Sequence, residues 1–516
     1  MMATSRFLNS LAGAGLFFLL VHGAAWAQQP KAEKPKPAET LPAPRGIPDA
    51  GESLAPVPSI LGPNTQPIDL PSALQLAGVQ NPQILLAQER VLEAVALRQL
   101  AAAQLLPTLN MGLNFDAHSG ALQQSTGNIL NVNRQSMYVG LGASAIGAGT
   151  VTIPGLVWAG NISEGFYGNL ISKQVVRHQQ FASLAMRNEM LLRVASAYLE
   201  LLRAEGHRVI ALKNRDEARE VARITTNYAK AKEGRQADAN RAAADLEQRT
   251  TELLQAENDM LAASARLCGL LGLDPSVRLQ AMESYTVPQA IVPPPISLPE
   301  LLAMALAQRP ELGERQNAIR AAFFELQKQK LLPFSPNVIF GYSAGAFGGG
   351  SNLVAVPFGN FADREDFDAV MFWSLRNLGL GNLAMVRLAQ SNYRSQNLRS
   401  TEVLDRIRAE VAAAYARAHA RFAQIDSAER GIQASELAFK EDFKRTFNRE
   451  GLPIEVLDSL RLLTRSRYTY LDAIIDYNLA QFALYVALGQ PPADWLARPI
   501  PADPATVTSP TPASPK

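Results

Sequence analysis

The chain has 516 residues, with 49 Lys or Arg and 47 Asp or Glu, so its formal net charge is only +2. This near-balance gives no reason to expect a nucleic-acid-binding protein, which usually carries a clustered basic surplus. The single cysteine, Cys268, excludes an intramolecular disulfide and a cysteine-rich zinc module. Aromatic residues are 7% of the chain and alanine is plentiful, which favours long packed helices.

Residues 1–27 have the features of a secretory signal peptide. Arg6 is the only charge, residues 11–21 are apolar, and Ala25-Trp26-Ala27 fits a small-x-small cleavage site. The apolar stretch is short for a membrane span of roughly 20 residues, so an uncleaved anchor is the less favoured alternative. No cysteine follows it, which excludes acylation of the bacterial lipoprotein type. We therefore expect a secreted chain.

Proline marks the boundaries of the predicted domains. Of the 33 prolines, 10 lie in residues 28–67, 8 in residues 491–516 and 5 in residues 288–299. We interpret these stretches as an N-terminal linker, a disordered tail and a linker between two repeats. Residues 155–274 and 358–452 contain no proline and are free to form very long helices.

The two regions separated by the middle linker, residues 68–287 and 300–490, share short sequences in the same order. Leu105-Leu106-Pro107 recurs as Leu331-Leu332-Pro333 at an offset of 226, and Glu233-Gly234 recurs as Glu450-Gly451 at an offset of 217. Repeated landmarks of this kind indicate a duplicated architecture.

Each repeat is predicted to have the same elements. A short helix begins after Leu-Pro with Asp69 or Ser297 as N-cap, and a longer helix leads to Leu-Leu-Pro. Two strands and a long helical hairpin follow, with the hairpins expected at residues 166–272 and 382–489. Each hairpin turns at its Glu-Gly pair, where we expect Gly234 and Gly451 to permit the backbone conformation of a tight connection.

Four segments alternate between apolar and small or polar residues. They lie near residues 108–116, 137–145, 337–345 and 367–375. Strands of about 9–11 residues with one apolar face suit an outer-membrane barrel. A soluble sheet on a helical core is the alternative, but the signal peptide and the uncharged flanks favour the membrane. Because four strands cannot close and lipid does not tolerate an open edge, strands must come from further copies, and three protomers would supply twelve.

This order of elements resembles the TolC family of outer-membrane efflux proteins, over roughly residues 68–492. The resemblance implies a mixed α/β membrane protein of two pseudo-repeats. It also implies a homotrimer, in which a twelve-stranded β-barrel in outer-membrane lipid continues into a periplasmic α-helical barrel. The stretch 145–165 departs from the family because it is rich in glycine and lacks the usual aromatic-Asp-Gly-Gly turn.

The resemblance implies a passive exit duct of a tripartite efflux or type I secretion system in a Gram-negative bacterium. Its partners would be a periplasmic adaptor and an inner-membrane pump, with no nucleic acid and no cofactor. No catalytic or metal-binding motif is found in the sequence, so no enzyme is expected. The alternative is a periplasmic coiled-coil scaffold or adaptor-like protein without a channel. Substrates of the duct can be drugs, metal ions or proteins.

Two sets of residues are the candidate sites. The adaptor would meet the hairpin tips, formed by Gly234, Arg235, Gly451, Leu452 and Pro453. The family's closed entrance carries acidic residues on the return helix, which the resemblance places at Glu455 and Asp458, with Asp238 at the analogous position. Threefold symmetry would make a ring of carboxylates that favours cations. The alternative is that acidic residues simply stabilise a first helical turn.

The family also uses a tyrosine just before the turn to bind the neighbouring hairpin. Here Phe447 or Asn448 stands near that place, and Tyr228 lies six residues before Gly234. The sequence therefore does not assign this contact.

Overall fold

The structure, a computed structural model, describes residues 65–145, 149–283, 286–293, 296–354, 358–448 and 450–490. The expected signal peptide, nearly all of the first proline-rich linker and the C-terminal tail lie outside these residues. The described residues belong to one compact unit.

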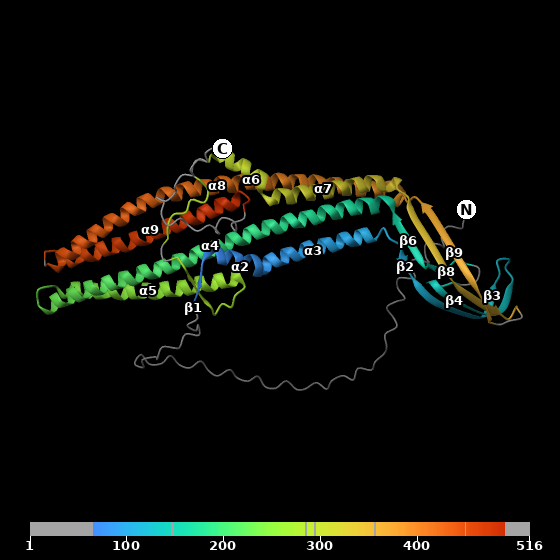
Figure 1. The fold of residues 1–516 in the computed structure, drawn as a ribbon, viewed down its shortest axis with the longest axis horizontal. Helices are drawn as coiled ribbons and strands as arrows, with labels where there is room; N and C mark the ends of the chain where they lie inside the picture. Colours follow the sequence, from blue (N-terminus) through green and yellow to red (C-terminus); the bar gives the residue numbers. More distant parts are fainter. Residues whose placement is uncertain are drawn as a thin grey trace, which may run out of the picture. The chain divides into compact units, whose positions relative to one another are not determined.

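Long helices dominate the described residues (Figure 1). The helices are α2 (Leu70–Gln80), α3 (Pro82–Ala103), α4 (Ile162–Lys230), α5 (Gln236–Leu271), α6 (Leu298–Gln308), α7 (Pro310–Leu331), α8 (Leu380–Phe447) and α9 (Pro453–Ala487). Helices α4 and α5 form one hairpin, and α8 and α9 form the other. With 69 and 68 residues, α4 and α8 would each extend about 100 Å at 1.5 Å per residue. Among the described helices, none is both long and apolar enough to cross a membrane.

Polar side chains close the first turns of several helices. Asp69 Oδ1 accepts a hydrogen bond from the Ser72 amide at 2.9 Å, and Asn161 caps α4 through the Ser163 amide at 3.0 Å. At the start of α6 the accepting side chain lies inside the helix: the amide of Ser297, the N-cap residue, donates to the Glu300 carboxylate at 3.1 Å. These bonds satisfy amides that have no partner within their own helix.

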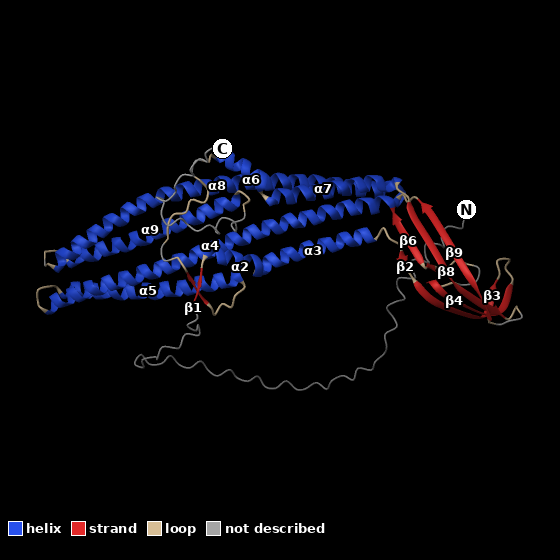
Figure 2. Cartoon of the chain, viewed as in Figure 1, coloured by secondary structure: helices blue, strands red, loops and turns tan. Residues whose placement is uncertain are grey.

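The sheet lies at the end of the helices opposite the hairpin turns (Figure 2). Its strands are β2 (Thr108–Leu109), β3 (Met111–Gln123), β4 (Ile129–Ala143), β5 (Ile153–Pro154), β6 (Leu156–Asn161), β8 (Asn337–Ser351) and β9 (Gly359–Phe372). Strand β3 pairs with β4, while β4 and β6 pair with successive parts of one edge of β8, and β9 pairs with its other edge. A separate parallel pair joins β1 (Thr65–Ile68) to β7 (Arg278–Ala281).

The four predicted strand segments overlap β2 and β3, β4, β8 and β9, although the predictions that end at residues 145 and 375 run past the ends of β4 and β9. Strands β1, β5, β6 and β7 were not predicted. Strand β6 falls in the glycine-rich stretch after β4, where the sequence indicated only a departure from the family pattern. It forms because residues 156–161 find a partner in residues 337–342 of β8. As a result α4 begins at Ile162, four residues before the predicted start of its hairpin.

The largest apolar cluster joins both repeats. It draws Leu74 from α2, Tyr198 from α4, Leu267 from α5, Ile407 from α8 and Phe482 from α9, all of them fully or almost fully buried. Burial, followed by the adjoining Glu283 carboxylate, raises the pKa of the Tyr198 phenol. Cys268 is buried in the same cluster, where it acts as a small apolar side chain.

Candidate functional site

The turn between α4 and α5 is held by backbone hydrogen bonds to one carbonyl. The amides of Glu233 and Gly234 both donate to Tyr228 O at 3.0 Å. A Cβ at Gly234 would lie 3.0 Å from Tyr228 Cβ, a tight contact that favours glycine for its small size. The left-handed residue is Lys232, with a φ of 61°, rather than Gly234. The sequence therefore assigned the wrong reason to this glycine.

The turn between α8 and α9 repeats this arrangement. The amides of Glu450 and Gly451 donate to Arg445 O at 2.8 and 3.2 Å. A Cβ at Gly451 would lie 3.1 Å from Arg445 Cβ, so close approach again selects glycine. Leu452 is 61% exposed, whereas Pro453, the first residue of α9, is half-buried.

Tyr228 links the two hairpins within one protomer. Its hydroxyl donates to Phe447 O at 2.8 Å and lies 3.3 Å from Thr446 O, at the C-terminal end of α8. A helix C-terminus carries carbonyls without intrahelical partners, so the phenol satisfies groups that would otherwise need water. The tyrosine near a turn that contacts the neighbouring hairpin is therefore Tyr228 of the first repeat.

The three candidate carboxylates each have a partner in their own hairpin. Asp238 lies 3.0 Å from Arg241, and Asp458, which is 68% exposed, lies 3.6 Å from Arg461. Glu455 accepts a hydrogen bond from the Leu452 amide at 3.2 Å and therefore caps α9. Among the contacts of the described residues, none joins Asp238 to the other two.

Ion pairs that the sequence did not reveal fasten α9 to the first hairpin. Arg461 lies 3.4 Å from Asp245, whose side chain is only 1% exposed, and Arg467 binds Glu217 at 2.5 and 2.8 Å. Arg203 binds Asp476 at 2.5 Å. Of these pairs, that of Arg467 and Glu217 is the most buried, with side chains 7% and 20% exposed, so removing Glu217 would leave a largely buried charge and destabilise the fold. The sequence gives one weak sign of these contacts. Arg203 and His207 are four positions apart, so they lie on the same face of a helix.

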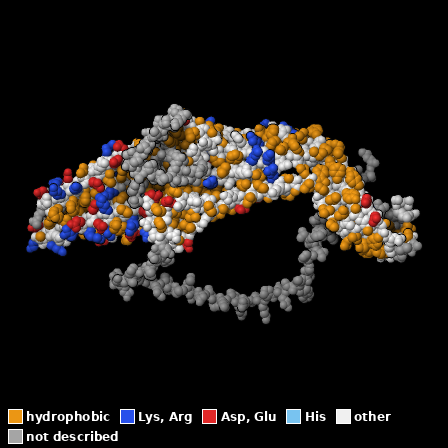
Figure 3. Space-filling view, viewed as in Figure 1, with side chains coloured by type: hydrophobic (Ala, Val, Ile, Leu, Met, Phe, Trp, Pro, Cys, Tyr) orange, Lys and Arg blue, Asp and Glu red, His pale blue; other side chains and the backbone are white. Residues whose placement is uncertain are grey.

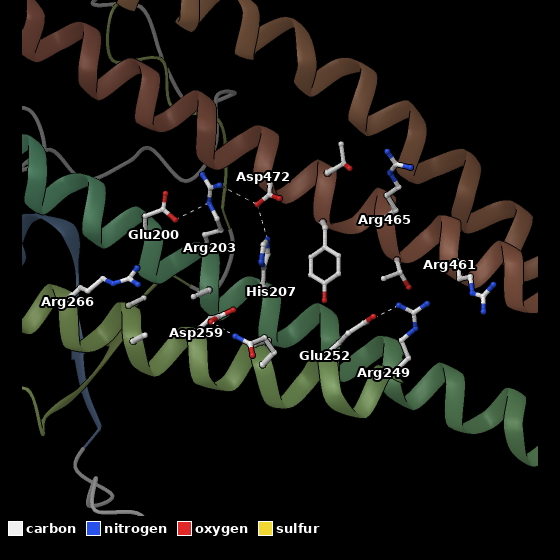
Figure 4. Close-up of a pocket in the computed structure, with 18 residues that line it drawn as sticks. Glu200, Arg203, His207, Arg249, Glu252, Asp259, Arg266, Arg461, Arg465 and Asp472 are labelled. Carbon is white, nitrogen blue, oxygen red and sulfur yellow. Dashed lines mark hydrogen bonds and ion pairs between the residues drawn. The ribbon is translucent and has the colours of Figure 1, made fainter. Parts of the chain in front are cut away.

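A polar groove of about 750 Å³ lies among α4, α5 and α9 (Figure 4). His207 of α4 points toward Asp472 of α9, with the ring nitrogen 2.9 Å from the carboxylate. Arg249 and Glu252, three positions apart on α5, pair at 2.9 Å along one wall of the groove. Burial, and then the Glu252 carboxylate, raise the pKa of Tyr468. No group of three or more metal-ligating side chains occurs within the part of the chain that the structure describes.

The sheet has two unlike faces. Alternate residues of each strand make an exposed apolar face, on which Met111 is 76% and Phe367 70% exposed. The other face is mostly small and polar, with Asn114 on β3 and Asp366 and Asp368 on β9, although Val370 and Phe372 of β9 are exposed apolar exceptions on it. Figure 3 shows a second contrast, between the two ends of the unit: apolar side chains dominate the visible surface of the sheet, and charged side chains gather over the hairpin turns.

Two tryptophans occupy matching places where the sheet meets the helices. The indole of Trp158 donates to Gln104 O at 3.2 Å, and that of Trp373 donates to Phe334 O at 3.2 Å. Both carbonyls belong to the Leu-Leu-Pro regions that precede the strands. In the first repeat this bond connects β6 to the end of α3, and in the second it connects the end of β9 to the segment after α7.

No protein-family model and no curated protein matches the sequence. Solved structures do match. The outer-membrane channel OprN has 20% identity and a TM-score of 0.68, covering 81% of this chain and 89% of that one. CmeC of Campylobacter jejuni has 15% identity and a TM-score of 0.69, covering 81% of this chain and 85% of that one. VceC of Vibrio cholerae has 16% identity and a TM-score of 0.64, covering 81% of this chain and 96% of that one.

The chain has the TolC fold. The predicted resemblance is confirmed at this level. In the TolC fold of this chain, the candidate tips lie at the helical end and the strands at the other.

Tyr228→Phe tests the link between the hairpins. Removing the hydroxyl should cost about 0.5–1.5 kcal/mol, the net worth of an ordinary hydrogen bond. Local opening at the end of α8 becomes more frequent, so the amides of Glu450 and Gly451 should exchange with solvent up to about ten times faster. Hydrogen exchange resolved by residue is the measurement. Tyr167→Phe, near the start of α4, is the matched control, and equal exchange in both variants would contradict the link.

Proposed function

We propose that this chain is the outer-membrane duct of a tripartite efflux system, through which solutes leave passively. The observation that carries the proposal is the sheet, whose exposed apolar face has no covering helix among the described residues. A periplasmic scaffold, the alternative function, has no use for such a face because it would be exposed to water.

The two edges of the sheet support assembly into a homotrimer. Within the described residues, β3 pairs only with β4, and β9 pairs only with β8. Unpaired strand edges are not tolerated in lipid, so the edge of one protomer must pair with that of another. Strands β2 and β3 lie end to end, as do β4 and β6, so each of these pairs counts as one strand of the barrel. Together with β8 and β9, one protomer supplies four strands, and three copies make a barrel of twelve.

Aromatic side chains support the position of the membrane. Trp158 stacks on Phe340 near the helices, at a centroid distance of 6.2 Å. Phe358 lies between Phe115 and Phe361 near the opposite end, with centroids 6.2 and 5.9 Å apart. Girdles of aromatic residues flank the apolar band of membrane barrels. The helices then extend into the periplasm of a Gram-negative bacterium.

The resemblance supplies the partners. The tips Gly234, Arg235, Gly451, Leu452 and Pro453 would meet a periplasmic adaptor, which connects the duct to an inner-membrane pump. OprN, CmeC and VceC are described as outer-membrane channels or proteins, in agreement with this location. A passive duct of this kind is not an enzyme. A type I secretion system is the other system that could use it.

Charged substitutions on the two faces of β9 test the membrane position. Phe367→Lys places a charge on the apolar face, where the cost in lipid is about 2–4 kcal/mol at mid-depth. It should prevent insertion, whereas Asp368→Lys on the opposite face should still form trimers with discrete conductance steps in planar bilayers. Equal behaviour of the two variants, or an unaltered parent that is monomeric and non-conducting, would reject the channel.

Substitution of both tip glycines tests the adaptor contact. In Gly234→Leu with Gly451→Leu, the new Cβ atoms already lie 3.0 and 3.1 Å from Tyr228 Cβ and Arg445 Cβ, so the leucines should crowd both turns and alter their surface. Export by cells should be lost while the trimer still assembles, because the strands are distant from the turns. Gly78→Leu, where the added Cβ meets nothing within 4 Å, is the control. Normal export by the double variant would refute the contact.

The acidic ring is tested by Glu455→Gln with Asp458→Asn. Rings of carboxylates favour cations, so single-channel recordings should show weaker cation selectivity and weaker block by multivalent cations. Asp426→Asn with Glu429→Gln removes two exposed carboxylates of the same spacing from α8 and serves as the control. If selectivity and block both stay at parental values, the carboxylates serve only the first turn of α9.

A further inference from the structure

The turn that joins β9 to α8 passes through left-handed backbone. Asn377 has a φ of 52° and a ψ of 48°, Leu378 has a φ of 57° and a ψ of 30°, and Gly379 has a φ of 91°. Asparagine and glycine adopt this conformation readily, whereas a leucine is strained by its Cβ. Among the non-glycine residues with a positive φ in the described part of the chain, Leu378 is the one with an apolar side chain.

The first repeat shows that a strand can enter a helix without this strain. Strand β6 ends at Asn161, whose φ of −100° and ψ of 132° are extended, and α4 begins at the next residue. The turn of the second repeat is nevertheless fixed in place, because the Arg376 amide donates to Oδ1 of the buried Asn382 at 2.8 Å. The strained leucine is therefore a feature of the second repeat alone.

The side chain of Leu378 is 97% exposed, so contacts with the described residues do not offset its strain. Leu375 and Leu380, close by in the sequence, are 65% and 72% exposed. We refer to Leu375, Leu378 and Leu380 as the apolar turn. Backbone strain persists at sites that bind a partner, and a group of exposed apolar side chains marks a surface that something else covers. The partner of the apolar turn therefore lies outside the protomer.

The apolar turn continues the exposed apolar face of the sheet. Phe367 and Met371 lie on that face of β9, and Trp373 and Leu375 extend the same alternation past the end of the strand. Leu375 is still extended, with a φ of −100° and a ψ of 100°, and the indole of Trp373 is held by its hydrogen bond to Phe334 O. Tryptophan is enriched where lipid meets water. This continuity indicates lipid as the partner.

The charge around the apolar turn has one sign. Residues 369–401 contain no aspartate or glutamate and four arginines, which are Arg376, Arg387, Arg394 and Arg399. Arg376 lies within the turn and is exposed. Basic side chains next to a membrane are attracted to the negative phosphates of lipid headgroups. The turn therefore combines apolar side chains with a cation, as a phospholipid surface requires.

We propose that the apolar turn inserts among the phospholipids of the periplasmic leaflet and anchors the second repeat at the membrane surface. The inference rests on the proposed function, in which the apolar face of the sheet contacts lipid. Leu378 enters the edge of the hydrocarbon, where its removal from water offsets the cost of its left-handed backbone. Arg376 stays at the level of the headgroup phosphates. A trimer would have three such anchors, one from each second repeat.

Site-specific fluorescence tests the insertion in the full-length trimer. Leu378→Cys is labelled with nitrobenzoxadiazole and reconstituted into vesicles of phosphatidylethanolamine and phosphatidylglycerol. Its emission should shift to shorter wavelength, and phospholipids with a nitroxide near the headgroup should quench it more than iodide in the water does. Leu398→Cys, exposed and about 27 Å from the start of α8, is the control that the lipid nitroxide should not quench. The parent should take up no label, because its only cysteine is buried.

A label at Phe367→Cys, on the apolar face of β9, separates failure of the anchor from failure of the duct. Quenching by lipid nitroxides at Phe367→Cys with none at Leu378→Cys overturns the anchor and leaves the duct standing. A blue shift at Leu378→Cys without quenching by lipid also overturns the anchor, because a neighbouring protomer then covers the turn. No lipid quenching at either position overturns both proposals. If Leu378→Cys does not assemble, Leu380→Cys takes its place with the same expected result.

Discussion

The pairing of β8 with both repeats is the interaction on which the sheet end of the molecule depends. One edge of β8 bonds first to β6 and then to β4, which belong to the first repeat, and the other edge bonds to β9. This register decides which residues share a face. It places Tyr138 opposite Phe347 and Asp368 opposite Gly341 on the polar side, and leaves Phe340 opposite Ala369 on the apolar side. A shift by one residue would exchange the two faces.

The alternation that predicted the longer strands also explains why β6 was missed. Around Met111 the apolar and small residues alternate strictly, so the strand is visible without its partners. In β6 both faces are apolar, with Val157 and Ala159 on one and Leu156 and Trp158 on the other, and only six residues are present. A short run of this kind becomes a strand through pairing, which local sequence does not encode.

The repeat offsets did contain a signal of this additional strand. From Leu-Leu-Pro to Glu-Gly the offset falls from 226 to 217, so the first repeat has nine additional residues between these landmarks. Helices α4 and α8 differ by only one residue, which leaves the sheet as the place of the difference. The offset gives the number of additional residues, but the pairing of residues 156–161 with residues 337–342 of β8 is not revealed by any spacing.

The hairpin turns show a different limit of sequence reasoning. Their positions follow from the repeated Glu-Gly pairs, but their geometry depends on contacts across the turn, so glycine is selected by size beside Tyr228 and Arg445. The contacts of Tyr228 with α8 and of Asp245 with Arg461 require the placement of one hairpin against the other, which neither repeat specifies alone.

The candidate carboxylates are not equivalent once these contacts are known. Glu455 is bonded to the Leu452 amide, so its charge stabilises the start of α9 whether or not a pore lies nearby. Asp458 lies one turn further along and is mostly exposed, and its partner Arg461 is shared with the buried Asp245. Because Arg461 is divided between two carboxylates, Asp458 is less fully neutralised than Asp238, which has Arg241 at 3.0 Å. In the proposed trimer, any negative field at the entrance would therefore depend mainly on Asp458, with Glu455 fixing the helix end that presents it.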